Sequence, residues 1–259
     1  MKFLSLAVTL IWTVTVSLSA DPKPETGRKV RFLAVGELPP FRQDVRDGVR
    51  YELEPPAGSI PPREILLGFE SGEPEATPLN LGRISDPLRV PAGGGDLLLK
   101  RRDAAEDAAP WLRLTRPETG DFLVILWRDA KNGTWDKVHS VILPDDPVAS
   151  PAGGVQIVNI SPASIGITIG SEKLIITPGK ILKRMVPKGA EETFQILLTD
   201  TSGSLRRLYS GVITQNSGER SLVLIYRADG ESPRSPLKVS VLREPAPPLP
   251  EAKLPAVPE

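Results

Sequence analysis

The sequence predicts an all-β protein made of two tandem antiparallel β-sandwich domains, immunoglobulin-like or jelly-roll-like in type. The first observation is a series of short runs rich in Val, Ile and Leu, each about the length of one strand. The second is the turn chemistry between them, since the 259 residues include 28 Pro and 22 Gly. Both are typical of a sandwich or barrel. Only one short segment has a helical pattern, which disfavours a parallel sheet with crossover helices.

The N-terminus has the three-part pattern of a secretory signal peptide. Lys2 precedes an apolar run over residues 3–16, and small residues then lead into a polar segment that contains Pro. The run is shorter than the roughly 20 residues of a membrane-spanning helix. We expect residues 1–20 to be a signal peptide cleaved after Ser19 or Ala20, and the mature protein to be periplasmic or secreted and not membrane-spanning. A retained N-terminal anchor is the alternative.

Residues 27–147 are predicted to form the first β-sandwich. Strand 122–127 is apolar on both faces, which indicates either a strand buried on both sides or one at a contact between domains. Residues Asp103–Ala109 are expected to be helical, because Asp103 can cap them and Pro110 ends them. The expected strands are Lys29–Val35, Glu64–Phe69, Leu88–Val90, Asp96–Lys100, Trp111–Thr115, Asp121–Arg128 and Trp135–Leu143.

A Pro-rich insertion at residues 37–62 interrupts this first domain. We expect it to run over the surface as an ordered segment. Long ordered loops are often functional, so the insertion is the first place to look for a binding surface. Besides three Pro-Pro pairs it carries the charged residues Arg42, Asp44, Arg46, Asp47 and Arg50.

Residues 154–244 are predicted to form the second β-sandwich, after a linker at Asp145–Gly153. Residues 245–259 hold six prolines and no apolar periodicity, which predicts a disordered Pro-rich tail. The expected strands of the second domain are Gly154–Ile160, Ser164–Ile169, Lys173–Thr177, Ile181–Val186, Glu192–Leu198, Arg207–Thr214, Ser221–Arg227 and Leu237–Leu242.

An internal similarity supports this division into two domains. Apolar strands also match by chance, so duplication and coincidence both stay open. In either case both halves end with a long apolar strand, a polar turn and another strand. The aligned pairs are Asp121–Arg128 with Arg220–Arg227 at an offset of 99 residues, Val30–Val35 with Val155–Ile160 and, after a slip of one residue, Ser140–Ile142 with Ser240–Leu242.

Composition excludes several classes of function. The chain has no Cys and one His, so disulfides, thiolate metal centres, a cysteine nucleophile and multi-His metal sites are all excluded. Its 32 basic and 32 acidic residues balance, which leaves no electrostatic footprint for nucleic acid. We therefore expect no cofactor and no nucleic-acid partner.

No catalytic, cofactor-binding or metal-ligating residue is predicted. A Ser-His-Asp triad needs a His that moves a proton, and His139 lies in mid-strand, where a structural role is more common. Gly93–Gly95 precedes a strand and lacks the helix N-terminus of a phosphate-binding loop. Residues Asp129–Asp136 superficially resemble a calcium loop, but Lys131 stands at a ligand position, and Asn132 before Gly favours a hairpin turn.

Three Trp residues of the first domain are candidates for stacking on a sugar ring. Trp127 lies in a strongly apolar strand and is expected in the core, whereas Trp135 follows the hairpin turn and is expected to be partly exposed. Trp111 follows a Pro. Ordinary packing and a sugar platform both stay open for these residues.

The second domain carries a resemblance to known proteins. It begins Val155–Pro162 and continues with Ile165–Gly170, Leu174–Gly179 and Ser221–Tyr226. This series resembles the tandem β-sandwich modules of exported bacterial proteins, among them the periplasmic accessory proteins of alginate O-acetylation. The resemblance covers roughly residues 154–244 and implies a signal peptide followed by two β-modules. The insertion and the tail depart from that pattern, and no functional residue is carried over.

The leading hypothesis is a non-catalytic protein of the periplasm or cell envelope that binds or scaffolds another envelope protein. Sandwiches present sheet edges and loops, so recognition would use strand addition or loop contacts. The alternative is a carbohydrate-binding or polysaccharide-modification accessory protein, with a polysaccharide as partner. A third hypothesis is an unrecognised hydrolase with converging carboxylates.

Overall fold

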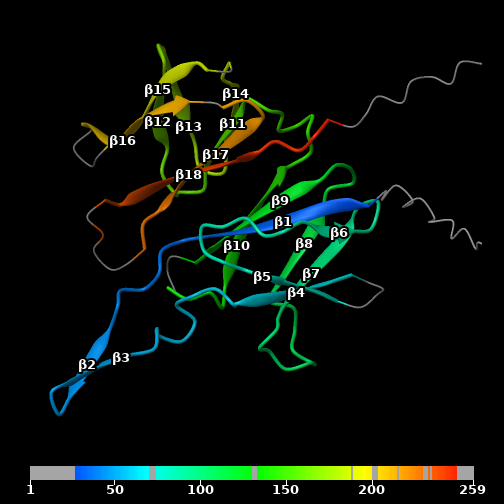
Figure 1. Cartoon of the computed structure of the whole chain (residues 1–259), viewed down its shortest axis with the longest axis vertical. Helices are drawn as coiled ribbons and strands as arrows, with labels where there is room; N and C mark the ends of the chain where they lie inside the picture. The colour runs from blue at the N-terminus through cyan, green and yellow to red at the C-terminus, as the bar shows by residue number, and fades with distance from the viewer. Residues whose placement is uncertain are drawn as a thin grey trace, which may run out of the picture.

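The computed structural model describes residues 27–69, 74–129, 133–187, 189–199, 204–214, 216–229, 233 and 235–249. Within this part of the chain there are eighteen strands in five sheets and no helix (Figure 1). The predicted all-β sandwich class is confirmed. The expected signal peptide, residues 1–20, lies outside the described residues.

The strands before the expected linker form two four-stranded sheets and a separate hairpin. They are β1 (Arg28–Val35), β2 (Gln43–Arg46), β3 (Val49–Glu52), β4 (Glu64–Gly68), β5 (Glu75–Pro78), β6 (Leu88–Val90), β7 (Gly95–Arg101), β8 (Leu112–Arg116), β9 (Phe122–Arg128) and β10 (Val138–Pro144). The sheet orders are β10-β9-β1-β6 and β5-β4-β7-β8, with β2-β3 as the hairpin. The pair β1–β9 is parallel, and the other pairs are antiparallel.

The strands after the linker form two further four-stranded sheets. They are β11 (Gly154–Asn159), β12 (Ile165–Ile169), β13 (Glu172–Ile176), β14 (Ile181–Met185), β15 (Glu191–Thr199), β16 (Leu205–Thr214), β17 (Glu219–Arg227) and β18 (Leu237–Pro245). The orders are β14-β11-β17-β18 and β13-β12-β15-β16, and the pair β11–β17 is again parallel. Apart from the hairpin β2-β3, the two halves therefore have the same strand order.

The register of the parallel pairs agrees with the sequence similarity between the halves. Val30 lies opposite Phe122, and Val155 lies opposite Ser221. The two sequence alignments equate these same residues, Val30 with Val155 and Phe122 with Ser221. Strands joined by two independent alignments therefore occupy equivalent places in the fold.

The slip of one residue expected between β10 and β18 is wrong. Ser140 lies opposite Leu126, and Val239 lies opposite Ile225, so the offset of 99 residues holds through both strands. Ser140 is therefore equivalent to Val239 and not to Ser240. The chance recurrence of a Ser-Val dipeptide suggested the slip, whereas the antiparallel ladder sets the register.

Each half has its own apolar core between its two sheets. Phe32, Leu97 and Phe122 are fully buried in the first core, and Ile157 and Phe194 are buried in the second. Burial of one such side chain stabilises the fold by about 1.5–3 kcal/mol. Each half thus buries its apolar residues as a β-sandwich does.

The two halves meet through a third apolar cluster, formed by the outer faces of their central sheets. Strand β9 shows why its sequence is apolar on both faces: Val124 packs into the first core, whereas Leu123 and Ile125 pack into the contact between the halves. Strand 122–127 is therefore buried on both sides and also lies at the contact between the halves, so both predicted alternatives are correct. The two halves contribute equivalent residues to this cluster: Leu33 and Val158, Val35 and Ile160, Leu123 and Leu222, Ile125 and Leu224, and Leu143 and Leu242.

A cluster of four charged side chains closes one end of this contact. Arg31 binds Asp145 at 2.6 Å and Glu244 at 2.5 Å, and Arg220 binds Asp145 at 2.7 Å and Glu244 at 2.8 Å. The Arg220 side chain is 6% exposed, and the two carboxylates compensate the cost of burying its guanidinium. Burial by itself lowers the pKa of Arg31, but hydrogen bonds to Glu244 and Asp145 outweigh it and raise the pKa.

All fifteen expected strands occur, with ends shifted by up to a few residues, while β2, β3 and β5 were not expected. The expected helix at Asp103–Ala109 is wrong, because the chain forms turns there. A segment this short does not sustain a helix. Asp103, the expected cap, instead accepts hydrogen bonds from the Arg101 guanidinium at 2.8 Å and 3.0 Å. Of the expected tail, Pro245 ends β18, residues 246–249 follow without regular structure, and the rest lies outside the described residues.

Candidate functional site

The insertion at residues 37–62 contains a hairpin that stands away from both sandwiches (Figure 1). Strands β2 and β3 pair with each other and, in the described chain, with no other strand. Their apolar side chains are exposed, at 58% for Val45, 52% for Val49 and 49% for Tyr51. Phe41, on the segment that leads into the hairpin, is 69% exposed. An isolated two-stranded hairpin is only marginally stable in water, so this is a surface that a partner would stabilise.

The register gives the hairpin two different faces. Val45 lies opposite Arg50 on one face, while Tyr51 and Val49 share the other face with Asp44 and Arg46. On that second face Arg46 Nε donates to Asp44 Oδ2 at 2.8 Å. In the described residues, each strand has one edge without a partner, so both edges are open to strand addition.

The turn of this hairpin is the signal that sequence reasoning missed. Asp47 has φ 52° and Gly48 has φ 78°, which are the left-handed values that a tight two-residue hairpin turn needs. An Asp-Gly pair between two Val-containing segments is a strong hairpin signal. The many charges and Pro-Pro pairs of the insertion obscured it, and the segment was expected to be a surface loop.

The chain that returns from the hairpin is anchored to the first sandwich. Pro61 and Pro62 are buried, and the carbonyl of Gly58 accepts a hydrogen bond from the Trp135 N–H at 2.7 Å. Arg128 Nη1 donates to the Ser59 carbonyl at 3.3 Å. The base of the insertion is therefore fixed, and only the hairpin projects.

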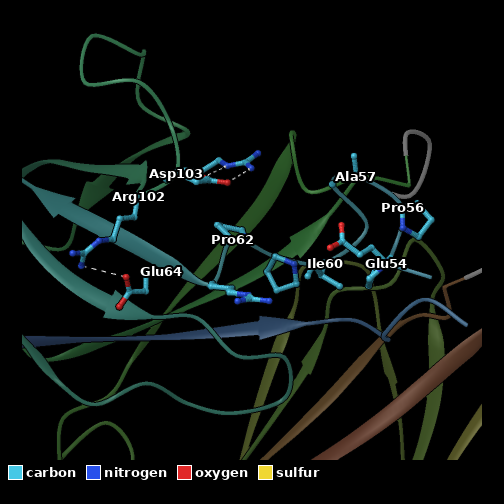
Figure 2. A pocket seen from close by; sticks show the side chains of 13 residues that line it. Glu54, Pro56, Ala57, Ile60, Pro62, Glu64, Arg102 and Asp103 are labelled. Carbon is cyan, nitrogen blue, oxygen red and sulfur yellow. Dashed lines mark hydrogen bonds and ion pairs between the residues drawn. The ribbon is translucent and has the colours of Figure 1, made fainter. Parts of the chain in front are cut away.

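This return segment lines an open groove of about 550 Å³. Figure 2 shows Glu54, Pro56 and Ile60 on its wall, with Arg102 and Asp103 from the turn after β7. Further lining residues include Pro55, Ala57, Pro62, Glu64 and Arg101. The groove therefore lies between the hairpin stem and the first sandwich.

Several of the charged side chains around the groove form ion pairs. Arg102 lies 3.2 Å from Glu64, and Arg101 lies 2.8 Å from Asp103 and 3.2 Å from Asp136. The hydrogen bond between Arg101 and Asp103 lowers the pKa of Asp103 and raises the pKa of Arg101. These groups are exposed or, in the case of Arg101, partly exposed, so each pair contributes at most about 1 kcal/mol. The groove therefore presents a mixed polar wall and no concentrated charge of one sign.

A second hollow, of about 450 Å³, lies where the two halves meet, and it contains the only His. His139 stacks on Trp127 with 5.7 Å between ring centroids, and Tyr226 lines the same cleft from β17. Trp127 and Tyr226 occupy equivalent positions in the two halves. The cleft is therefore built by aromatic side chains from both central sheets.

Ser161 and Asp229 also line this cleft, but their hydrogen bonds lead away from His139. The Ser161 hydroxyl donates to Asn159 Oδ1 at 2.6 Å. Asp229 Oδ1 accepts from Arg128 at 3.0 Å, and its Oδ2 accepts from the Glu37 N–H at 2.7 Å. A triad requires a hydroxyl bonded to the imidazole and the imidazole bonded to a carboxylate, and these bonds of Ser161 and Asp229 do not form that chain.

The two predictions about Trp exposure are reversed in the structure. Trp135 is 1% exposed in the first core, and Trp127 is partly exposed at the cleft. Trp111 is also partly exposed, and its Nε1 donates to the Trp135 carbonyl at 2.7 Å. Trp135 packs into the first core, and its N–H donates to the carbonyl of Gly58 in the return segment, a contact between distant residues that no local pattern encodes.

The weak cation signals lead to no metal centre in the described residues. No group of three or more His, Cys, Asp or Glu side chains gathers there. In the calcium-like segment Asp136 pairs with Arg101, and Asn132, the expected turn residue, lies outside the described residues. Gly133, the other turn residue, has φ 63°.

Comparison with known proteins leaves the function to be argued from geometry. No protein-family model and no curated protein sequence matches the chain. The described residues contain no helix of the length and apolarity that crossing a bilayer requires. The projecting hairpin and its anchored stem are the most distinctive candidate site in the structure.

Proposed function

We propose that this is an exported, non-catalytic β-sandwich protein that binds another protein of the cell envelope through hairpin β2-β3. The partner would add an edge strand of its own to β2 or β3 and cover Val45 on one face or Val49 and Tyr51 on the other. Main-chain hydrogen bonds then give affinity, and the alternating side chains give specificity. Export is the part of this proposal that rests on the N-terminal sequence pattern.

The observation that carries the proposal is an apolar hairpin held out on a fixed base. Five of the thirteen large apolar side chains that are exposed in the described chain lie between residues 38 and 51. Exposed apolar patches of this kind mark interaction surfaces in soluble proteins. The anchored stem, through Gly58 and Ser59, holds the hairpin in place without covering it.

The proposal is tested by a photo-crosslinking amino acid at position 45 of the mature protein, with position 175 as the control. Ile175 is also exposed, at 77%, but lies on β13 of the second half. We expect one envelope protein to be crosslinked from position 45 and not from position 175. In the purified complex, the amides of residues 43–52 should then exchange hydrogen more slowly.

A double variant, Val49→Ser with Tyr51→Ser, separates binding from folding. Both residues are exposed, so its unfolding curve should match that of the wild type, while the complex should weaken at least about tenfold, as expected for an aromatic anchor. Equal crosslinking from positions 45 and 175, or a complex unaffected by the double variant, would show that the hairpin is not the binding surface.

The aromatic cleft favours a polysaccharide-binding accessory role as a second candidate function. A partly exposed Trp ring beside His139 and Tyr226 is a suitable platform for the flat face of a sugar. We expect a glycan that binds there to quench Trp fluorescence, and Trp127→Ala to abolish that quenching. The absence of quenching across a glycan panel would remove this candidate and leave the hairpin proposal unaffected.

A further inference from the structure

The second sandwich has a cavity of about 390 Å³ that opens between its edge strands β16 and β18. Its inner wall consists of Phe194, Ile213 and Val223, which are at most 6% exposed. Val212 and Val241 stand at the opening and are 48% and 37% exposed. The cavity therefore leads from the surface directly into the apolar core.

Comparison of equivalent positions shows which side chain occupies this point in the first sandwich. In the first half Phe122 lies opposite Pro144, and the Phe122 side chain is fully buried in the core. The equivalent pair in the second half is Ser221 opposite Arg243, and both residues line the cavity. A small residue replaces a large ring, so the second core lacks the volume that Phe122 fills in the first.

Tyr209 forms the side wall of the cavity. Its ring lies 5.9 Å from the Phe194 ring, centroid to centroid, and runs across the backbone of Gly211. A Cβ on Gly211 would come within 2.8 Å of the Tyr209 hydroxyl, so glycine at that position lets the ring lie along the strand. An aromatic wall thus extends the apolar lining to the opening.

Arg243 brings a positive charge to this apolar cavity. It lies opposite Ser221 in the ladder, so its side chain is on the face of β18 that lines the cavity, and it is exposed at the opening. An apolar interior with a cation at its mouth is complementary to a molecule with an aliphatic chain and an anionic head.

We propose that this cavity binds a free aliphatic carboxylate, with the chain between Phe194 and Val223 and the carboxylate on Arg243. A neutral chain of the same length would gain the apolar contacts but not the charge-assisted hydrogen bond. The site is separate from hairpin β2-β3, so this proposal does not depend on the proposed function.

The test titrates the full mature protein with decanoate and, separately, with decan-1-ol. Calorimetry gives the affinity, and methyl chemical shifts of Ile213 and Val223 locate the site. We expect both ligands to shift these methyl signals and decanoate to bind more tightly. Arg243→Gln should weaken decanoate about tenfold and leave decan-1-ol unchanged. Lys173→Gln, an exposed cation on β13, is the matched control and should change neither affinity.

Ser221→Phe introduces the residue found at the equivalent position of the first half, Phe122, and should abolish binding of both ligands. Its folding is checked by its unfolding curve, and Arg243→Gln keeps the test valid if the ring does not fit. The proposal is overturned if decanoate shifts no methyl signal of the cavity, or if Arg243→Gln weakens both ligands equally. Unchanged binding by a folded Ser221→Phe protein would overturn it as well.

Discussion

Glu244 illustrates how a single side chain at the contact between the halves connects folding to pH. Burial alone raises the pKa of this carboxyl, but hydrogen bonds from Arg31 and Arg220 and the charges of both outweigh burial, so the pKa is lowered below its ordinary value of 4.5. A lowered folded-state pKa means that the ionised form stabilises the fold. This stabilisation is complete above the pKa of the unfolded chain and is lost as the pH falls through the folded-state pKa.

We therefore expect the free energy of unfolding to decrease as the pH falls below about 4.5, and Glu244→Gln to remove part of that decrease. The measurement is urea unfolding at a series of pH values. Glu191→Gln, at an exposed position, is the control and should retain the wild-type pH dependence. An identical slope below pH 4.5 in wild type and Glu244→Gln would contradict the assigned role.

The residue scale is also where sequence reasoning was weakest. Arg31 binds carboxylates more than a hundred residues away, and no local pattern pairs those residues. The exposures of Trp127 and Trp135 were reversed for the same reason, since long-range packing decided them: Trp135 lies in the first core, and Trp127 lies at the contact between the halves. The candidate site was located only as the insertion at residues 37–62, without its anchoring contacts.

At the scale of strands, the sequence carried most of the information. Strands such as β4 and β12 alternate buried and less buried residues, and Pro and Gly mark their ends, so period and turn chemistry sufficed to predict them. Strands β2 and β3 were missed because exposed strands lack the apolar alternation of half-buried ones. For those two strands the turn at Asp47 was the usable signal.

At the scale of the whole molecule, the contact between the halves is the feature with the clearest energetic consequence. The same surface is used on both sides, as in the isologous interface of a symmetric dimer. Because Leu224 is 1% exposed there, the halves should unfold together. We expect one unfolding transition in the wild type.

Leu224→Asp places an unpaired charge in this contact and should cost about 4 kcal/mol. We expect the single transition to split into two and the radius of gyration, measured by X-ray scattering, to increase. Ile175→Asp, at an exposed position on β13, is the control and should leave both measurements unchanged. A single transition with unchanged scattering in Leu224→Asp would show that the halves do not depend on this contact.

The parallel pair β1–β9 has a consequence for the order of events as the polypeptide is made. Strand β1 pairs with β6 over residues 28–30, but its longer parallel neighbour is complete only when residues 122–127 have appeared, so the N-terminal sheet stays incomplete through most of that half's synthesis. Pairings of such long sequence separation close slowly. Until then β1 exposes Phe32 and Leu33 to whatever surrounds the nascent chain, and a holding chaperone would have a defined stretch to protect.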